Sequence, residues 1–593
     1  MSVERLITDN IDVWTSTVKT KSSSGRGSSK KRELYGIKKL RELILELAVR
    51  GKLVPQDPTD EPVSLLLERI VEEKAQLVKE KKIKNPKKPS EISDDEKPFD
   101  IPEEWKWIRL NEYAQIFSGN AFKSGDFSSE VGAKTIKITN AGVGNLIETD
   151  EYLPEEFLTT YSQYRVVKND LILALTRPYI ADGLKVSMCP DSYHNSLLNQ
   201  RVAAIRAYVN PEYAFFMLRS PYVLNTYKNR FSGSGLQPNL KMSDVTELVI
   251  PICSEQEQHR IVAKVDELMT LCDQLEQQTE ASIDAHQVLV TTLLDTLTNS
   301  ADTNELIQNW ARISEHFDTL FTTEASIDQL KQTILQLAVM GKLVPQDPND
   351  EPAAKLLERI AEEKAQLVKE KQIKKQKALP PIAEDEKPFE LPKGWEWCRL
   401  GDLELSSEAG WSPKCLDTAR NEDKWGVLKV SAVTWGKYNP DENKELPASL
   451  EPREHLEVQD GDFLISRANT AELVAKAVVV PADSPRKLMM SDKVIRFKFS
   501  KKVSSEYINL FNNSLFSRNY YSEVAGGTSS SMKNVSREQI KNLLICLPPA
   551  ETQQEIIDTL GTFYKICDQL KRRLRGSQQT QLQLTDAMVE KVL

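Results

Sequence analysis

Residues 43–84 read LILELAVRGKLVPQDPTDEPVSLLLERIVEEKAQLVKEKKIK, and residues 333–374 read TILQLAVMGKLVPQDPNDEPAAKLLERIAEEKAQLVKEKQIK. The two stretches align without a gap, and 33 of their 42 positions are identical. Their offset of 290 residues is much longer than the roughly 20–50 residues of a solenoid repeat. It has the length of a whole domain plus its linker. The chain is therefore a tandem duplication of one unit.

Each copy of the repeat predicts two helices separated by a proline-rich break. Apolar residues at helical spacing predict a first helix over 35–51, with Gly51 at its C-terminal end. Three prolines interrupt the chain over 55–62, and a helix with one apolar face and one Glu/Lys face follows over 63–82. The tail that runs on to residue 97 is a charged linker that cannot form a core.

A region of different character follows each copy of the repeat. Short apolar runs such as KTIKIT, DLILAL and RVAAIRA alternate with turn residues over 98–250, which predicts an α+β globule. Its opening motif PEEWKWIRL (102–110) recurs as PKGWEWCRL (392–400), so residues 388–547 are expected to repeat the plan. The two regions diverge heavily beyond this motif.

Each globular region ends in proline and a long predicted helix with an apolar residue every three or four positions. These residues are Ile261, Val265, Leu268, Cys272 and Leu275 in the first helix, and Ile556, Leu560, Phe563, Cys567, Leu570 and Leu574 in the second. A 3.5-residue period is typical of a coiled-coil seam that needs a partner. We expect the two helices to pair with each other in antiparallel fashion; the alternative is that each packs on its own globule.

The predicted fold class is α+β, with two pseudo-symmetric α/β domains separated by an antiparallel two-helix coiled-coil spacer and flanked by duplicated helical segments. We predict five segments along the chain. They are an N-terminal helical region and charged linker at 1–97, with the first repeat at 36–84; a first globular domain at 98–250; a central region at 251–387, with a spacer helix at 254–299 and the second repeat at 326–374; a second globular domain at 388–547; and a C-terminal spacer helix at 548–593.

Composition excludes several classes of protein. The formal net charge is −9, so a nucleic-acid partner does not show in the total, although local patches matter more than the sum. The seven cysteines form no CxxC pair, which argues against a zinc site or a disulfide framework. No apolar run approaches the length that a membrane-spanning helix needs, so we expect a cytoplasmic protein without a membrane partner.

Catalytic motifs are not evident. Residues 231–235, FSGSG, resemble the glycine turn of methyltransferases, but no (N/D)PP(Y/F) motif accompanies them. No GxxxxGK(S/T) loop is present, and the five histidines show no metal-ligand spacing. We therefore expect no catalytic, cofactor-binding or metal-binding residues in this chain.

The globular regions instead combine basic, aromatic and amide side chains in loop-like contexts. Lys and Arg neutralise phosphates, while Arg, Asn and Gln read base edges in the major groove. The glycine/serine runs at 231–239 and 525–534 lie at matching places before each closing strand. The candidate DNA-binding residues are Lys123, Lys137, Asn140, Arg177, Tyr179, Lys185, Arg230, Ser232, Ser234, Gln237, Asn239 and Lys241 in the first region, and Trp411, Lys414, Lys429, Trp435, Lys437, Arg467, Asn469, Thr528, Ser529, Ser530, Lys533 and Asn534 in the second.

These features together resemble the specificity subunits of type I restriction–modification systems, in particular the group with a long N-terminal extension. The likeness rests on the repeated LAVxGKLVPQDPxDEP, the opening motifs, the strands at 169–178 and 461–469, the GSGLQPNL and GGTSSSMKN loops, and the closing PICSEQEQHRIVAKVDEL and LPPAETQQEIIDTL segments. It covers nearly the whole chain from about residue 36.

The resemblance implies a non-catalytic subunit with two target-recognition domains, each binding one half of a bipartite, asymmetric site in double-stranded DNA. Its partners would be two modification subunits, which bind S-adenosylmethionine and methylate adenine, and restriction subunits, which use ATP and Mg. A helix of about 35 residues is roughly 50 Å long, against about 34–36 Å for a turn of DNA. Helix length would then set the gap between the half-sites.

Two other functions are compatible with the sequence. One is a stand-alone DNA methyltransferase or nuclease with an unrecognised site, which methylation or cleavage by the purified chain alone would indicate. The other is a two-headed scaffold that does not bind DNA, which the absence of sequence-specific binding by the assembled complex would indicate.

Overall fold

The computed structural model describes residues 3–21, 31–83, 89–181, 183–230, 238–529 and 532–593. The chain forms two compact units, Met1–Ser282 with Ser577–Leu593, and Ile283–Gly576. The two long helices predicted from the sequence are α10 (Glu255–Thr298) and α19 (Ala550–Val592), and each contributes residues to both units. Within the described residues, no helix is long and apolar enough to cross a membrane.

The repeat forms two helices in each unit, as predicted: α3 (Tyr35–Val49) and α4 (Val63–Lys79) in the first, α13 (Glu324–Val339) and α14 (Ala353–Lys369) in the second. α3 ends at Val49, two residues before the predicted end; Gly51 follows its C-cap with a φ of +67° that favours glycine, and the Lys52 amide closes the last turn on the Leu47 carbonyl at 2.9 Å. A Cβ at Gly51 would lie 2.6 Å from Pro102. The end of α3 in the repeat therefore packs against the opening motif of the globule.

The PQDPxDEP segment joins each repeat to the start of a long helix. In the first unit the Arg260 guanidinium donates to Asp60, and the Trp105 indole and the Gln56 amide both donate to Glu257 on α10, at 3.0 and 2.6 Å. In the second unit Thr552 on α19 donates to Asp350, and the indole of Trp395 donates to Gln346 instead. The repeat thus fixes where each long helix begins.

A half-buried lysine attaches each of the helices α4 and α14 to the globule of its own unit. Lys74 donates to the carbonyls of Asn111 and Glu112 in the short helix α5 (Leu110–Tyr113), and Lys364 donates to Gly401 in α15 (Leu400–Leu403). Burial lowers the pKa of the Lys74 amine to about 8. Each amine satisfies carbonyls that a four-residue helix leaves without partners.

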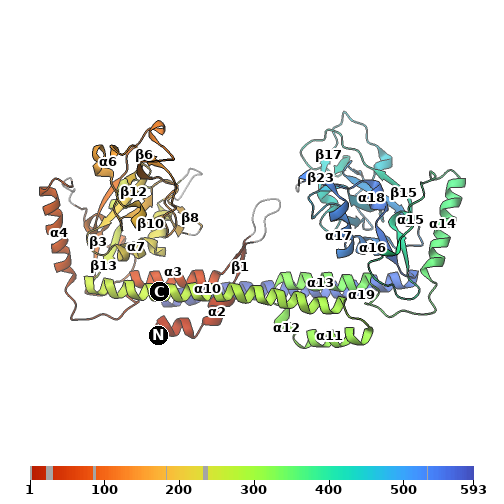
Figure 1. Cartoon of the computed structure of the whole chain (residues 1–593), viewed down its shortest axis with the longest axis horizontal. Coiled ribbons are helices and arrows are strands. Elements are labelled where there is room, and N and C mark those ends of the chain that lie inside the picture. The colour runs from red at the N-terminus through yellow and green to blue at the C-terminus, as the bar shows by residue number, and fades with distance from the viewer. Residues whose placement is uncertain (1–2, 22–30, 84–88, 182, 231–237, 530–531) are drawn as a thin grey trace. The chain divides into compact units, whose positions relative to one another are not determined.

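The first globule is built on the four-stranded antiparallel sheet β10-β7-β12-β4 (Figure 1). A smaller sheet, β11-β5-β6, the hairpin β8-β9 and the pair β13-β3 complete it. The elements are β3 (Lys106–Arg109), β4 (Ala114–Ser118), β5 (Ala133–Ile136), β6 (Tyr152–Leu153), α6 (Phe157–Thr160), β7 (Leu171–Ala174), β8 (Tyr179–Ile180), β9 (Gly183–Leu184), β10 (Val186–Met188), β11 (Leu197–Leu198), β12 (Val202–Ala207), α7 (Pro211–Arg219), α8 (Pro221–Asn229), α9 (Met242–Thr246) and β13 (Val249–Ile252).

The second globule repeats this frame and adds a sheet. Its main sheet, β20-β18-β22-β15, and its pair β14-β25 match those of the first, and β17-β16-β21 and β19-β24-β23 are three-stranded. The elements are β14 (Glu396–Arg399), β15 (Glu404–Ala409), β16 (Gly426–Leu428), β17 (Asn443–Glu445), β18 (Phe463–Ser466), β19 (Ala468–Asn469), β20 (Ala477–Val479), β21 (Leu488–Met489), β22 (Val494–Phe499), α16 (Ser505–Asn512), α17 (Leu515–Val524), β23 (Gly526–Ser529), β24 (Met532–Asn534), α18 (Arg537–Lys541) and β25 (Leu544–Leu547).

Short helices precede the repeat in both units. They are α1 (Val3–Thr8) and α2 (Ile11–Ser16), followed by strands β1 (Lys19–Lys21) and β2 (Lys31–Glu33), in the first unit, and α11 (Thr303–Glu315) and α12 (Phe317–Leu320) in the second. Trp14 is fully buried, and its carbonyl lies so close to Gly36 of α3 that a Cβ there would be 2.2 Å away. The N-terminal helices are therefore part of the first core.

The predicted seam residues are buried or partly buried, but the two sets belong to different cores. Residues 261–275 share a core with α3 and with 588–593 at the end of α19. Residues 556–574 share the other core with α13 and with 290–297 near the end of α10. The long helices therefore run antiparallel, as expected, but each predicted seam covers only the first half of its helix. That half packs with a repeat helix and with the last part of the other long helix.

Candidate nucleic-acid interface

Two of the predicted segments, 461–469 and 525–534, meet in the second globule on the sheet β19-β24-β23. Asn469 pairs with Lys533 and Ala468 with Asn534, while the amide of Val535 donates to the carbonyl of Arg467 at 2.9 Å. Lys533 also donates from Nζ to the Gly527 carbonyl at 2.8 Å, which joins β24 to β23. Residues that are far apart in the sequence therefore form one polar surface.

A loop with an exposed tryptophan adjoins this sheet. The amide of Asn469 donates to the Thr434 hydroxyl at 3.4 Å. The next residue in that loop, Trp435, has 70% of its surface exposed, and Lys437 is exposed as well. Gly436 between them has a φ of +77°, so the loop needs glycine at this position.

The first globule brings the corresponding segments together without a full sheet. Thr176 and Asn239 form an isolated bridge, and the Arg177 amide donates to Pro238 at 2.9 Å. The hairpin β8-β9 holds Tyr179, and the Lys185 amide donates to Pro178 at 2.7 Å. Arg177 and Asn239 are exposed here. Ser232, Ser234 and Gln237, as well as Ser530 of the second globule, lie outside the described residues; Thr528 and Ser529 belong to β23.

Asn140 does not fit the predicted DNA contact. It is fully buried, accepts from the Lys137 amide at 2.8 Å and donates to Ile147 and Thr149. All these bonds close the turn that follows β5, so the side-chain amide of Asn140 is hydrogen-bonded within the protein. The sequence could not reveal this, because a buried turn asparagine and an exposed base reader look alike.

Several other predicted residues have partners within the protein. Lys137 pairs with Glu151 at 2.8 Å and lies over the Phe127 ring, and Lys429 pairs with Glu442 at 3.5 Å. Arg230 donates to the Asp244 carbonyl at 2.9 Å, and the Arg453 guanidinium covers the Trp411 ring. The backbone amide of Lys241 is bound by Asp244. The side chains of Lys123, Lys241 and Lys414 are exposed.

The comparison with known families follows the same two regions. The family model for the type I restriction modification DNA specificity domain matches residues 102–285 and 392–576. The type I restriction enzyme EcoEI specificity subunit of Escherichia coli is 48% identical over the whole of both chains. The chain belongs to the specificity-subunit family of type I restriction–modification systems. The EcoAI specificity subunit of the same species is 40% identical to this specificity subunit, over 100% of this chain and 99% of the relative.

Two solved structures also match this one over most of its length. A chain from a study of complex assembly and conformational transition in a type I R-M system gives a TM-score of 0.47 at 18% identity, covering 83% of this specificity subunit and 98% of that chain. The HsdS subunit from Thermoanaerobacter tengcongensis gives a TM-score of 0.38 at 18% identity, with 84% and 98% coverage.

Backbone bonds establish which positions of the two globules of this specificity subunit are equivalent. The amide of Leu175 donates to Arg201, and that of Arg467 donates to Lys493; Leu240 and Val535 donate back to Leu175 and Arg467. Arg467 is therefore equivalent to Leu175, and Arg177 to Asn469. The two arginines occupy different positions, although both follow the same strand motif.

The same alignment reveals two basic residues that the sequence reasoning missed. Arg201 and Lys493 are exposed and stand at the same place, directly before β12 and β22. Each lies next to the polar surface of its own globule. The available signal was a basic residue before both strands, in QRVAAI and DKVIRF, but it becomes visible only when the strands are superposed.

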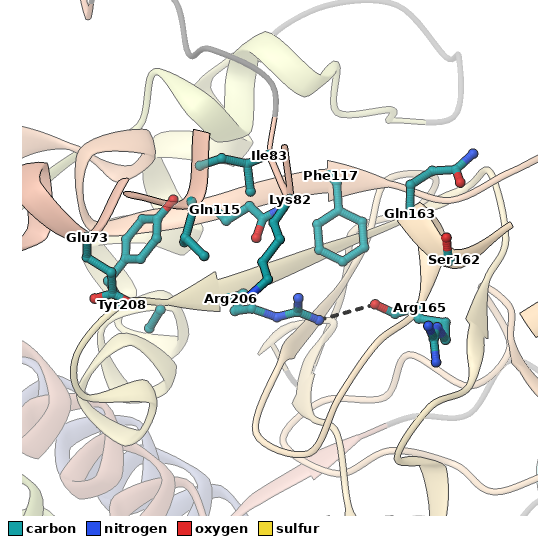
Figure 2. Close-up of a pocket in the computed structure, with 12 residues that line it drawn as sticks. Glu73, Lys82, Ile83, Gln115, Phe117, Ser162, Gln163, Arg165, Arg206 and Tyr208 are labelled. Atoms are coloured by element: carbon teal, nitrogen blue, oxygen red, sulfur yellow. Dashed lines mark hydrogen bonds between the residues drawn. The ribbon is translucent and has the colours of Figure 1, made fainter. Parts of the chain in front are cut away.

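A cavity of about 280 Å³ lies in the first unit between the end of α4 and the strands β4 and β12 (Figure 2). Arg206 crosses it and donates to both carboxylate oxygens of Asp170, at 2.8 and 2.7 Å, and to the Arg165 carbonyl. Burial, with Glu73 nearby, raises the pKa of Tyr208 to about 12. Among the described residues, no group of three or more His, Cys, Asp or Glu is arranged to hold a metal. Because it pairs with Asp170, the Arg206 guanidinium in this cavity stabilises the sheet.

Proposed function

We propose that this specificity subunit reads a bipartite, asymmetric site in double-stranded DNA, with one half-site bound by each globule. The observation that carries the proposal is a shared frame with different side chains at equivalent places. The main sheets and the opening-closing strand pairs match, whereas Leu175 corresponds to Arg467 in the alignment, and Arg177 to Asn469. Arginine and asparagine prefer different base edges, so one frame presents two different codes.

The loop after β5 and β16 differs in the same way. Ile147 donates to Asn140 as Asn439 donates to Ala432, which aligns Gly144 with Gly436 and Val143 with Trp435. Both glycines have a positive φ, so the backbone of the loop is retained. The loop keeps its backbone, but Val in the first globule corresponds to an exposed Trp in the second. This difference supports two globules that bind different DNA half-sites.

The chemistry is assigned to other chains under this proposal. Two modification subunits with S-adenosylmethionine would methylate adenine in the half-sites, and restriction subunits with ATP and Mg would cut. The specificity subunit would position both kinds of partner on the DNA. The continuous helix α10, 44 residues long, supports a further role for helix length in setting the gap between half-sites.

Exchange of one globule tests the proposal. Residues 388–547 would be replaced by the corresponding segment of the EcoEI specificity subunit, and the methylated sequence would be determined genome-wide in cells that carry the complete system. We expect one half of the methylated site to change while the other half stays. The reciprocal exchange of 98–250 should change only the other half. A change in both halves, or in neither, would contradict the proposal.

A further inference from the structure

The two long helices carry opposite charge at the same place. Both contain the segment CDQL, at 272–275 and 567–570. It is followed by EQQTE over 276–280 in α10 and by KRRLR over 571–575 in α19. Two acidic residues in one helix thus correspond to four basic residues in the other. Duplication supplied the same helix twice, so this difference arose afterwards.

Pairing within the second unit accounts for only part of the basic charge. Lys571 pairs with Asp328, and Arg575 binds Glu324 through two bonds of 2.8 Å. Arg572 and Arg573 are exposed, as is Lys565 two turns earlier. Within the residues that the structure describes, Arg572 donates only to a carbonyl of its own helix. We call Lys565, Arg572 and Arg573 the basic face of α19, because positions 565, 569, 572 and 573 lie on one side of a helix.

The basic face lies next to the loop that carries Trp435. Gly436 and Lys437 line a cavity of about 500 Å³ together with Gly561 and Tyr564 of α19. Gly561, Lys565, Asp568 and Arg572 follow one stripe of the helix at spacings of four and three. The hydrogen bond from Lys331 lowers the pKa of Asp568, and the charge of Lys437 contributes to the same shift. Lys565 and Arg572 lie on this stripe, so these two residues of the basic face border the same surface as the loop lysine within the second unit.

The corresponding face of α10 has no such charge. The residues 295 positions earlier are Thr270, Gln277 and Gln278, and all three are exposed. One helix has exposed, uncharged residues where its duplicate has exposed cations. The fold itself therefore does not require positive charge at these positions.

We propose that the basic face of α19 binds backbone phosphates of DNA beside the half-site of the second globule, without reading its sequence. This inference rests on the proposed DNA-reading function. Phosphates fit because the three cations stand on one exposed face of a straight helix, beside a lysine and an exposed tryptophan of a reading loop. Only α19 carries these charges. The DNA between the half-sites is therefore bound near the second half-site and not at the equivalent place of α10.

The test compares variants of the specificity subunit in the assembled methyltransferase complex. The variant K565Q/R572Q/R573Q removes the three charges and keeps residues that favour helix. Binding to DNA with both half-sites, and to DNA with both scrambled, would be measured over a series of salt concentrations. Each phosphate contact contributes about 0.9 to the slope of log K against log salt. We expect the slope to fall by about two to three, and affinity near 0.15 M salt to drop on the order of 100-fold, for both DNAs alike.

A matched control removes the same charge elsewhere in the second unit. Lys374, Lys375 and Lys377 are exposed on the segment after α14, and K374Q/K375Q/K377Q should leave the salt slope unchanged. The methylated sequence should be the same in all variants, since phosphate contacts carry no sequence information.

Other outcomes would overturn the inference. An unchanged slope in K565Q/R572Q/R573Q shows that the face does not meet phosphates. An unchanged slope with weaker retention of the modification subunits assigns the face to a protein partner. If the wild-type complex itself does not distinguish the specific DNA from the scrambled DNA, the proposed function has failed, which is a separate result.

Discussion

Arg109 donates from Nη1 and Nη2 to the two carboxylate oxygens of Glu96, at 2.6 and 2.9 Å. The same guanidinium donates to the carbonyls of Glu91 and Glu247 at 3.0 Å. The side chain of Arg109 is only 5% exposed, so one buried cation joins the linker before the globule to the end of the globule. Arg399 also binds Glu386, donating from Nη2 to both carboxylate oxygens, and donates from Nη1 to the Asn542 carbonyl.

Removing this arginine should destabilise its own unit. We expect Arg109→Ala to lower the free energy of unfolding by about 3 kcal/mol, because three carbonyl and carboxylate groups lose a buried donor. Arg399→Ala should do the same in the second unit. Denaturant unfolding of the specificity subunit within its complex measures both. A loss in each no larger than that of an ordinary surface substitution would show that the linkers are not held by these residues.

The stability that the Arg109–Glu96 pair contributes should also depend on pH. The hydrogen bonds from Arg109 lower the pKa of Glu96 from its ordinary 4.5 to about 2. A carboxyl with a lowered pKa in the folded state stabilises the fold fully above its ordinary pKa, and this contribution is lost as pH falls toward the lowered value. Wild-type protein should therefore be more stable than Glu96→Gln at pH 7, and the difference should shrink between about pH 4.5 and 2. A constant difference across that range would contradict the account.

Asn140 and Asn239 should behave in opposite ways. We expect Asn140→Ala to cost about 2 kcal/mol of stability, because it removes a buried side chain that bonds the Lys137 amide, the Ile147 carbonyl and the Thr149 hydroxyl. Asn239 is exposed, so Asn239→Ala should leave the melting temperature nearly unchanged and weaken binding to specific DNA. Thermal unfolding and a binding titration on both variants check this. Equal melting temperatures for the two variants would return Asn140 to the candidate DNA contacts.

The repeat helices pair with the long helices through one ion pair of the same polarity in both units, Arg41–Asp273 and Lys331–Asp568. A second pair is reversed: Arg41 of α3 also binds Glu276 of α10, whereas Asp328 of α13 binds Lys571, the residue of α19 that corresponds to Glu276. This reversal disfavours pairing of a repeat helix with the wrong long helix. We expect Lys571→Asp and Asp328→Lys to cost about 0.5 kcal/mol each, and the double exchange to restore stability. A double-mutant cycle measures the coupling; additive losses would show that the pair is not coupled.

Helix length should set the gap between the half-sites. Insertion of one heptad into both α10 and α19 preserves the 3.5-residue seam and adds about 10 Å of helix. That equals about three base pairs at ~3.4 Å each. We expect the gap in the methylated site to lengthen accordingly, and the half-site sequences to stay. An unchanged gap in a genome-wide methylation assay refutes a role for helix length.

The sequence determined the duplication, the helices of the repeat, the two long helices and the fold class. Periodicity and capping are local properties, so they are readable without tertiary structure: Gly51 follows the C-terminal end of α3, which ends at Val49, and α10 spans Glu255–Thr298, within a residue of prediction. The family could be identified for the same reason, since the motifs of the repeat are short and contiguous.

Only the tertiary structure decided which residues share a surface. Arg467, Asn469 and Lys533 meet because β19 and β24 pair across a long intervening stretch of chain, and strand register is not a local property. The tertiary structure also removed Asn140 from the candidate DNA contacts, because its side chain is buried. It showed that Arg177 and Arg467 are not equivalent, and it added Arg201 and Lys493 to the candidates. The apolar seams of the two long helices likewise looked complementary in sequence. Which residues each seam packs against depends on where each antiparallel helix begins, and the packing of the repeat fixes that position.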